Sequence, residues 1–91
     1  MNLKNIIKNC NVLNTIGDLN REVKSIDFDS RKASKDSLFV CIKGYSVDGH
    51  SFIQKAYEQG TRAFLIEDDV NMLDDCTVIK VENTREAMAI V

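Results

Sequence analysis

The residues best suited to contact a ligand stand between positions 29 and 50. They form three runs: Asp29-Ser30-Arg31, Leu38-Phe39 and Gly44-Tyr45-Ser46-Val47-Asp48-Gly49-His50. Each run adjoins a segment with the sequence of a β-strand, and open α/β sheets bind ligands at the carboxyl ends of their strands. We therefore expect the three runs to form one ligand-binding edge.

Four segments predict the strands that position these runs. Residues 23–28 alternate apolar and polar side chains, as a half-buried strand does, whereas residues 38–42 form an apolar run typical of a strand covered on both faces. Residues 63–66 and 77–81 predict two further strands. With the helix between 51 and 60, they predict an α/β fold: a small single domain with a mainly parallel or mixed sheet flanked by helices.

The helix after the third run has the clearest boundaries. Ser51 and Gln54 have the spacing of a capping box, and Gly60 supplies the left-handed residue that commonly ends a helix. The apolar residues of this helix are expected on one face; they are Phe52, Ile53, Ala56 and Tyr57.

Two more helices are expected near the ends of the chain. The first has apolar residues at Leu3, Ile6, Ile7 and Cys10, with Asn2 as its cap, and a loop containing Gly17 follows it. The other begins after Asn83 and reaches residue 91 without a stop signal. We therefore expect residues 1–91 to be one domain of a longer chain.

Composition restricts the partners. Twelve basic and 14 acidic residues give a net charge of -2, which provides no general attraction for nucleic acid or for an anionic membrane. The N-terminus has no signal-peptide pattern, and no apolar stretch is long enough to span a bilayer. Cys10, Cys41 and Cys76 match no zinc-ligand spacing and are expected to be reduced, so we predict a cytoplasmic protein.

The three runs resemble the N-terminal domain of the Mur ligases, most closely the tripeptide-synthetase (MurE) branch. In that family a strand leads into Asp-Ser-Arg, a second strand carries Leu-Phe-Val and ends in Gly, and Asp-Gly-His opens a helix with the pattern Phe-Ile-x-x-Ala-x-x-x-Gly. Here these motifs are residues 29–31, 38–44 and 48–60, so the resemblance covers most of the chain.

The resemblance implies that this domain receives the UDP end of UDP-N-acetylmuramoyl-dipeptide. Ser30 is the first candidate contact, since a hydroxyl suits a ribose or diphosphate oxygen; the alternative is a turn residue that bonds only backbone. Phe28 either lies against the nucleotide or packs in the core. Tyr45, Ser46 and Val47 occupy the loop that contacts uracil in the family, although that loop varies among its members.

The remaining residues of the runs are expected to shape the loops. The Asp29 carboxylate is expected to cap backbone amides, and the Arg31 guanidinium is expected to hold a loop in place, although Arg31 could face a diphosphate. Gly44 and Gly49 permit tight turns, and Asp48 suits a helix N-terminus. His50 is expected to lock the loop rather than to act as an acid-base catalyst.

No catalytic residue and no metal ligand set is expected within the 91 residues. The sequence lacks the phosphate-binding pattern GxxxxGK[ST], and its glycines at positions 17, 44, 49 and 60 cannot supply it. We expect this domain alone to be inactive and to hold no cofactor. The resemblance places ATP and Mg²⁺ in following domains, the next of which is the expected partner within the chain.

Three functions remain open from the sequence. The first is the substrate-binding domain of the ATP-dependent amide ligase that adds the third amino acid, lysine or meso-diaminopimelate, in peptidoglycan synthesis. The second is the same domain of the related ligase that adds D-Ala-D-Ala (MurF type), which shares Asp-Ser-Arg and Asp-Gly-His. The third is a stand-alone interaction module that has lost the ligand.

Overall fold

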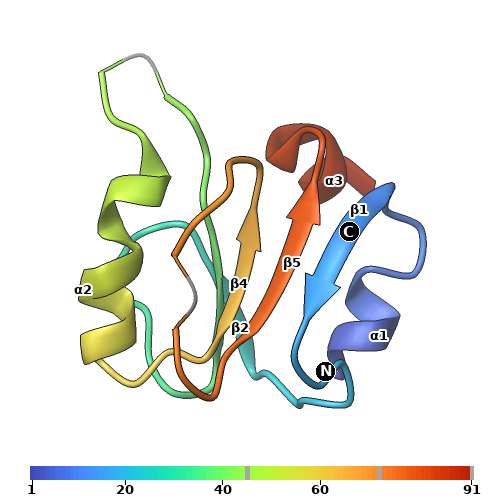
Figure 1. Cartoon of the computed structure of the whole chain (residues 1–91), viewed down its shortest axis with the longest axis horizontal. Helices are drawn as coiled ribbons and strands as arrows, with labels where there is room; N and C mark the ends of the chain where they lie inside the picture. The colour runs from blue at the N-terminus through green and yellow to red at the C-terminus, as the bar shows by residue number, and fades with distance from the viewer. Residues whose placement is uncertain (45, 72, 91) are drawn as a thin grey trace.

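A five-stranded sheet in the order β1-β5-β4-β3-β2 forms the centre of the computed structural model, which describes residues 1–44, 46–71 and 73–90 (Figure 1). Strand β2 pairs in parallel with β3, β3 with β4, and β4 with β5, whereas β1 is antiparallel to β5. The strands are β1 (Val12–Ile16), β2 (Ser25–Asp27), β3 (Ser37–Val40), β4 (Ala63–Ile66) and β5 (Thr77–Val81). The predicted α/β class with a mixed sheet is confirmed.

Helices cover both faces of the sheet. Helix α2 (Ile53–Glu58), preceded by the 3-10 helix η1 (Gly49–Phe52), lies on one face, and α1 (Leu3–Ile6) and α3 (Thr84–Ile90) lie on the other (Figure 1). The segment from β3 through α2 to β4 joins two parallel neighbours in the way of a βαβ unit.

Strand alternation divides the core into two apolar clusters. Leu38 and Val40 of β3 pack with α1 and α3, whereas Phe39 between them packs with α2. The rings of Phe39 and Phe64 meet edge to face, with centroids 6.3 Å apart. Because side chains on a strand point alternately to opposite faces, a strand buried on both sides reads as the nearly continuous apolar run seen in the sequence.

The predicted strands over 63–66 and 77–81 are confirmed to the residue, but β1 was not predicted. Residues 12–16 were assigned to a loop region because β1 is an edge strand on which only Val12 is half-buried, so no alternation marks it. The predicted strand over 23–28 is too long, since β2 contains only residues 25–27. Phe28 lies beyond β2 and is 52% exposed, so the alternative that its side chain packs in the core is wrong.

The predicted caps are partly wrong. Asn2 caps α1 by accepting from the Lys4 amide, and Gly60 has the expected left-handed φ of 106°. The Ser51–Gln54 capping box does not form: Asp48 caps the helical segment by accepting from the His50 amide, and the Ser51 hydroxyl donates to the Asp48 carbonyl. Phe52 does not share the buried face, because it is 37% exposed while Ala56 is fully buried.

The cysteines are free thiols in the described structure, with Cys41 and Cys76 buried and Cys10 half-buried. Burial raises the pKa of the Cys41 thiol far above its ordinary value, which suits its place in the core beside α2. Within the described ranges, no helix has the length and apolar character needed to cross a membrane.

Candidate functional site

The carboxyl ends of β2, β3, β4 and β5 lie at one edge of the sheet, because these four strands are parallel. The first run follows β2, the third run follows β3, residues 67–70 follow β4, and α3 begins shortly after β5. The sheet therefore brings residues 28–31 and 46–50 to the same edge. The prediction that the second run belongs to this edge is wrong, because Leu38 and Phe39 are fully buried within β3.

A cleft opens beside the first run. Its lining comes from the loop after β2 and from the helical segment opposite, and consists of Phe28, Asp29, Ser30, Arg31, Phe52 and Lys55. Ser30 is only 6% exposed, and within the described chain its hydroxyl forms no hydrogen bond. A hydroxyl in this position is available to a bound molecule.

Asp29 and Arg31 form a bidentate ion pair. The Arg31 guanidinium donates to both carboxylate oxygens of Asp29 at 2.8–3.2 Å, and the Arg31 amide donates to Asp29 Oδ1 at 2.9 Å. These hydrogen bonds from Arg31 lower the pKa of Asp29 from its ordinary 3.8 to about 2. The pair connects the two residues that flank Ser30, and its two charges cancel.

Gln59 fastens this loop to the end of α2. Its side-chain amide donates to the carbonyl oxygens of Ser30 and, at 3.1 Å, of Ala33. Sequence reasoning missed this residue, because nothing in a helix-terminal glutamine indicates a partner 29 residues earlier in the chain.

Backbone hydrogen bonds connect described residues of the third run to one another and to the end of β3. The Gly44 amide donates to the Val47 carbonyl at 2.8 Å, and the Gly49 amide donates to the Ile42 carbonyl at 2.9 Å. A Cβ on Gly49 would lie 2.7 Å from the Ile42 amide nitrogen, so the close approach of two backbones requires glycine here. Ser46 and Val47 are exposed, and the prediction for Tyr45 lies outside the described residues.

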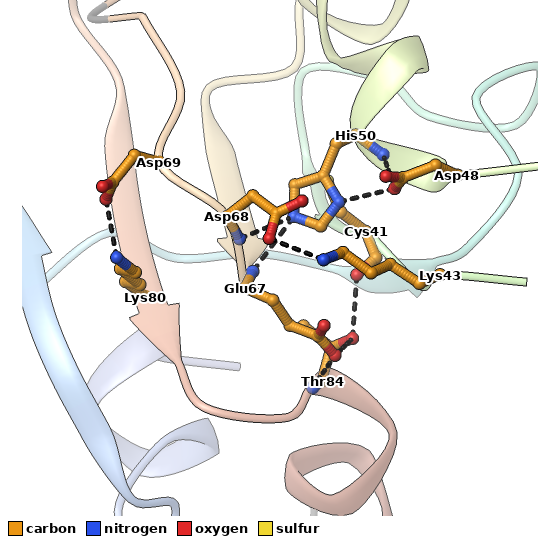
Figure 2. A network of polar contacts seen from close by, with 9 residues as sticks. All are labelled: Cys41, Lys43, Asp48, His50, Glu67, Asp68, Asp69, Lys80 and Thr84. Carbon is orange, nitrogen blue, oxygen red and sulfur yellow. Dashed lines mark hydrogen bonds and ion pairs between the residues drawn. The ribbon is translucent and has the colours of Figure 1, made fainter.

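Both ring nitrogens of His50 are engaged within the protein (Figure 2). Nδ1 lies 2.7 Å from Asp48 Oδ1, and Nε2 accepts from the amides of Glu67 and Asp68 at 3.0 and 3.2 Å. Since two N–H groups point at Nε2, we assign the ring proton to Nδ1, which donates to Asp48. In this arrangement His50 fastens the third run to the end of β4 and has no nitrogen left for acid-base chemistry.

Glu67 and Thr84 extend this network to α3. The amide and the hydroxyl of Thr84 both lie within hydrogen-bonding distance of Glu67 Oε1, at 2.8 and 3.0 Å, and the hydroxyl also reaches the Cys41 carbonyl (Figure 2). Lys43 pairs with Asp68 at 2.7 Å. Glu67 was not singled out in the sequence, although its position directly after β4 was a signal that could have marked it.

Asp48, His50 and Asp68 offer ligand atoms within 4.8 Å of one another, which is close enough for a metal ion. Each of them is already engaged: His50 uses both nitrogens, Asp48 accepts from His50, and Asp68 pairs with Lys43. We therefore assign no metal to this cluster.

The described contacts do not join the first run directly to the third. No hydrogen bond links residues 28–31 to residues 46–50 in the part of the chain that the structure describes. The two stretches share the sheet edge, and contact of one ligand with both stays a prediction.

The family comparison covers most of the chain. The model of the Mur ligase family, catalytic domain, matches residues 22–91. The chain is 45% identical, over 98% of its length, to UDP-N-acetylmuramoyl-L-alanyl-D-glutamate--2,6-diaminopimelate ligase of Clostridioides difficile. It is 44% identical, over 99% of its length, to the ligase of that name numbered 1 in Clostridium acetobutylicum. The chain spans only 18% and 19% of those two proteins.

Solved structures agree on the fold. MurF from Acinetobacter baumannii superposes with a TM-score of 0.75 at 23% identity, over 96% of this chain and 18% of that one. MurF from Thermotoga maritima in complex with ADP superposes with a TM-score of 0.66 at 26% identity, over 75% of this chain and 16% of that one. The family match over residues 22–91 and the 45% identity to the Clostridioides difficile ligase show that the chain belongs to the Mur ligase family.

Proposed function

We propose that the chain is the N-terminal substrate-binding domain of a MurE-type ligase. The parent enzyme uses ATP to add the third amino acid to UDP-N-acetylmuramoyl-L-alanyl-D-glutamate in peptidoglycan synthesis. The observation that carries this proposal is the 45% identity, over 98% of the chain, to a relative named for that reaction. The names of the relatives favour 2,6-diaminopimelate over lysine as the amino acid added.

We assign substrate binding to this domain and ATP binding to the rest of the enzyme. Positions 1–91 contain no GxxxxGK[ST] pattern, so we assign ATP and Mg²⁺ to the part of the relatives that this chain does not span. We assign binding of the uridine end of the substrate to the sheet edge, because Phe28 is exposed there and the Ser30 hydroxyl has no hydrogen-bond partner among the described residues. We also assign the protein to the cytoplasm, in keeping with its three free cysteines.

The MurF alternative has less support. The superposed MurF structures share 22–26% identity with the chain, whereas the diaminopimelate ligases named above share 44–45%. A superposition at this lower identity supports a shared fold and does not favour the MurF reaction.

Titration with UDP-N-acetylmuramoyl-L-alanyl-D-glutamate, followed by amide NMR, tests the proposal. We expect signals of residues 28–31 and 46–50 to shift together, with a Kd on the order of 0.1–1 mM because the rest of the enzyme is absent. ATP serves as the control and should shift neither stretch. Shifts confined to other parts of the domain, or none at all, would instead support the stand-alone module.

A further inference from the structure

The connection from β2 to β3, residues 28–36, carries Ser30 and contains no helix, although the structure describes all of its residues. Its backbone carbonyls therefore need hydrogen-bond donors from other parts of the chain. Gln59, at the end of α2, donates to this connection at Ser30 itself. We propose that Gln59 is a positioning residue for substrate binding, which acts by holding the Ser30 hydroxyl at the cleft. This inference deepens the proposed function and rests on it.

Two hydrogen bonds join Gln59 to the connection. The side-chain nitrogen Nε2 donates to the Ser30 carbonyl and, at 3.1 Å, to the Ala33 carbonyl. The Ala33 amide also donates to the Ser30 carbonyl, at 3.3 Å, so residues 30–33 form a turn that Gln59 holds at both ends. Two directional bonds from one amide group restrict orientation as well as distance. Gln59 therefore fixes where the backbone of Ser30 lies relative to α2.

The Ser30 side chain is the part of this turn that can reach a ligand. The residue is only 6% exposed, yet it lines the cleft. Its hydroxyl has no partner within residues 1–44, 46–71 and 73–90, whereas every fully buried side-chain N or O atom of these residues has one. The hydroxyl is therefore accessible from the cleft, while the carbonyl of the same residue is held by Gln59. A shift of that carbonyl would move the hydroxyl as well.

The Asp29–Arg31 pair cannot replace Gln59 in this role. It joins residues two positions apart, so it restrains the local turn and not the distance of Ser30 from α2. The pair is also exposed, and exposed ion pairs contribute little. Gln59 reaches a partner 29 residues away. Because a binding group must be held within about 0.5 Å of its productive position by its neighbours, loss of this link should reduce affinity.

Thr61 separates a positioning role from a merely structural one. It is fully buried, and its Oγ1 donates to the Ser34 carbonyl at 2.8 Å. Thr61 thus fastens the same connection to the same end of α2, but at Ser34, which does not line the cleft. If binding required only a stable connection, loss of either link would weaken it. The inference predicts that only loss of the Gln59 link does.

The test is an NMR titration with UDP-N-acetylmuramoyl-L-alanyl-D-glutamate. Gln59→Met keeps the length of the side chain and removes its N–H donors, so Kd should rise about three- to fivefold. Gln59→Glu, a second variant without donors, should behave alike. Gln54→Met is the matched control and should bind like the original chain, since Gln54 is an exposed glutamine of α2 outside the cleft. Thr61→Val should lower the urea midpoint and leave Kd unchanged.

A double-mutant cycle tests whether Gln59 acts through Ser30. Ser30→Ala should weaken binding about fivefold in the original chain but less than about twofold in Gln59→Met, because the hydroxyl is already misplaced in that variant. Equal effects of Ser30→Ala in the two backgrounds would show that Gln59 and Ser30 act independently, and would overturn the inference.

The outcomes separate this inference from the proposed function. Gln59 variants that bind like the original chain overturn the inference and leave the proposed function intact. The same holds if Thr61→Val weakens binding as much as Gln59→Met does, because stability of the connection would then explain both losses. If the original chain does not bind UDP-N-acetylmuramoyl-L-alanyl-D-glutamate, the proposed function fails, together with the inference that rests on it.

Discussion

The Thr84 hydroxyl lies 2.8 Å from the Cys41 carbonyl, although 43 residues separate the two in the chain. Both residues are fully buried, and Cys41 directly follows β3 while Thr84 begins α3. Thr84 also bonds Glu67, the residue that directly follows β4. One threonine thus connects the ends of two neighbouring strands to the start of the helix after β5.

Replacing Thr84 by valine should destabilise the fold by about 1–3 kcal/mol, because it leaves the buried Cys41 carbonyl without this donor. Thr84→Ser keeps the hydroxyl and should recover most of that loss. Urea unfolding of both variants measures the difference. Equal stability of the valine and serine variants would show that the hydroxyl contributes nothing.

Replacing His50 by alanine removes the acceptor for the amides of Glu67 and Asp68. We expect a loss of about 1–3 kcal/mol in unfolding free energy and faster hydrogen exchange at these two amides. Ser51→Ala is the control, since it removes one exposed hydrogen bond from the same turn. Unchanged exchange at Glu67 and Asp68 in the His50 variant would contradict the assigned role.

Gly49→Ala tests the close backbone approach in the third run. The added methyl group would lie 2.7 Å from the Ile42 amide nitrogen, so the turn must shift at a cost of about 1–3 kcal/mol. The measurement is thermal unfolding, accompanied by NMR signals of residues 42–50. A variant with the original melting temperature and unshifted signals would show that the turn adapts freely.

The Asp29–Arg31 pair should make stability depend on pH. Since the folded pKa of Asp29 is about 2, below its ordinary 3.8, the ionised form stabilises the fold above pH 4 or so. That contribution is lost as pH falls from about 4 to about 2. Asp29→Asn should therefore be less stable than the original chain at pH 6, with the difference vanishing near pH 2. A difference in urea midpoint that stays constant over this range would reject the pair as its source.

The sequence predicts the parts of the fold that local pattern determines. Strand β4 is a continuous apolar run buried on both faces, β5 is buried except at the half-buried Lys80, and the left-handed Gly60 follows from its position after a helix. It does not reveal β1, whose side chains are mostly exposed at the sheet edge and show no alternation. The capping box failed because Asp48, three residues before Ser51, provides the cap first.

For the candidate site, too, the sequence predicts the residues that a local motif marks and misses those whose partners are distant in the chain. Ser30 and Phe28 were found because a motif marks them, whereas Gln59 and Glu67 depend on partners 29 and 17 residues away. Such contacts follow from how the strands pair, and no local spacing encodes them. Phe52 was assigned to the buried face because helical spacing alone does not distinguish a core side chain from one that faces a cleft.

The most direct test of the central claim is the affinity of Ser30→Ala for UDP-N-acetylmuramoyl-L-alanyl-D-glutamate, measured by NMR titration against Ser34→Ala as the matched control. Ser34 lies four residues later, is exposed and does not line the cleft. Loss of the Ser30 hydroxyl should weaken binding by about 1 kcal/mol, roughly fivefold in Kd, with the fold retained, whereas Ser34→Ala should bind like the original chain. A Ser30→Ala variant that binds as tightly as the original would contradict the account and leave Ser30 as a turn residue.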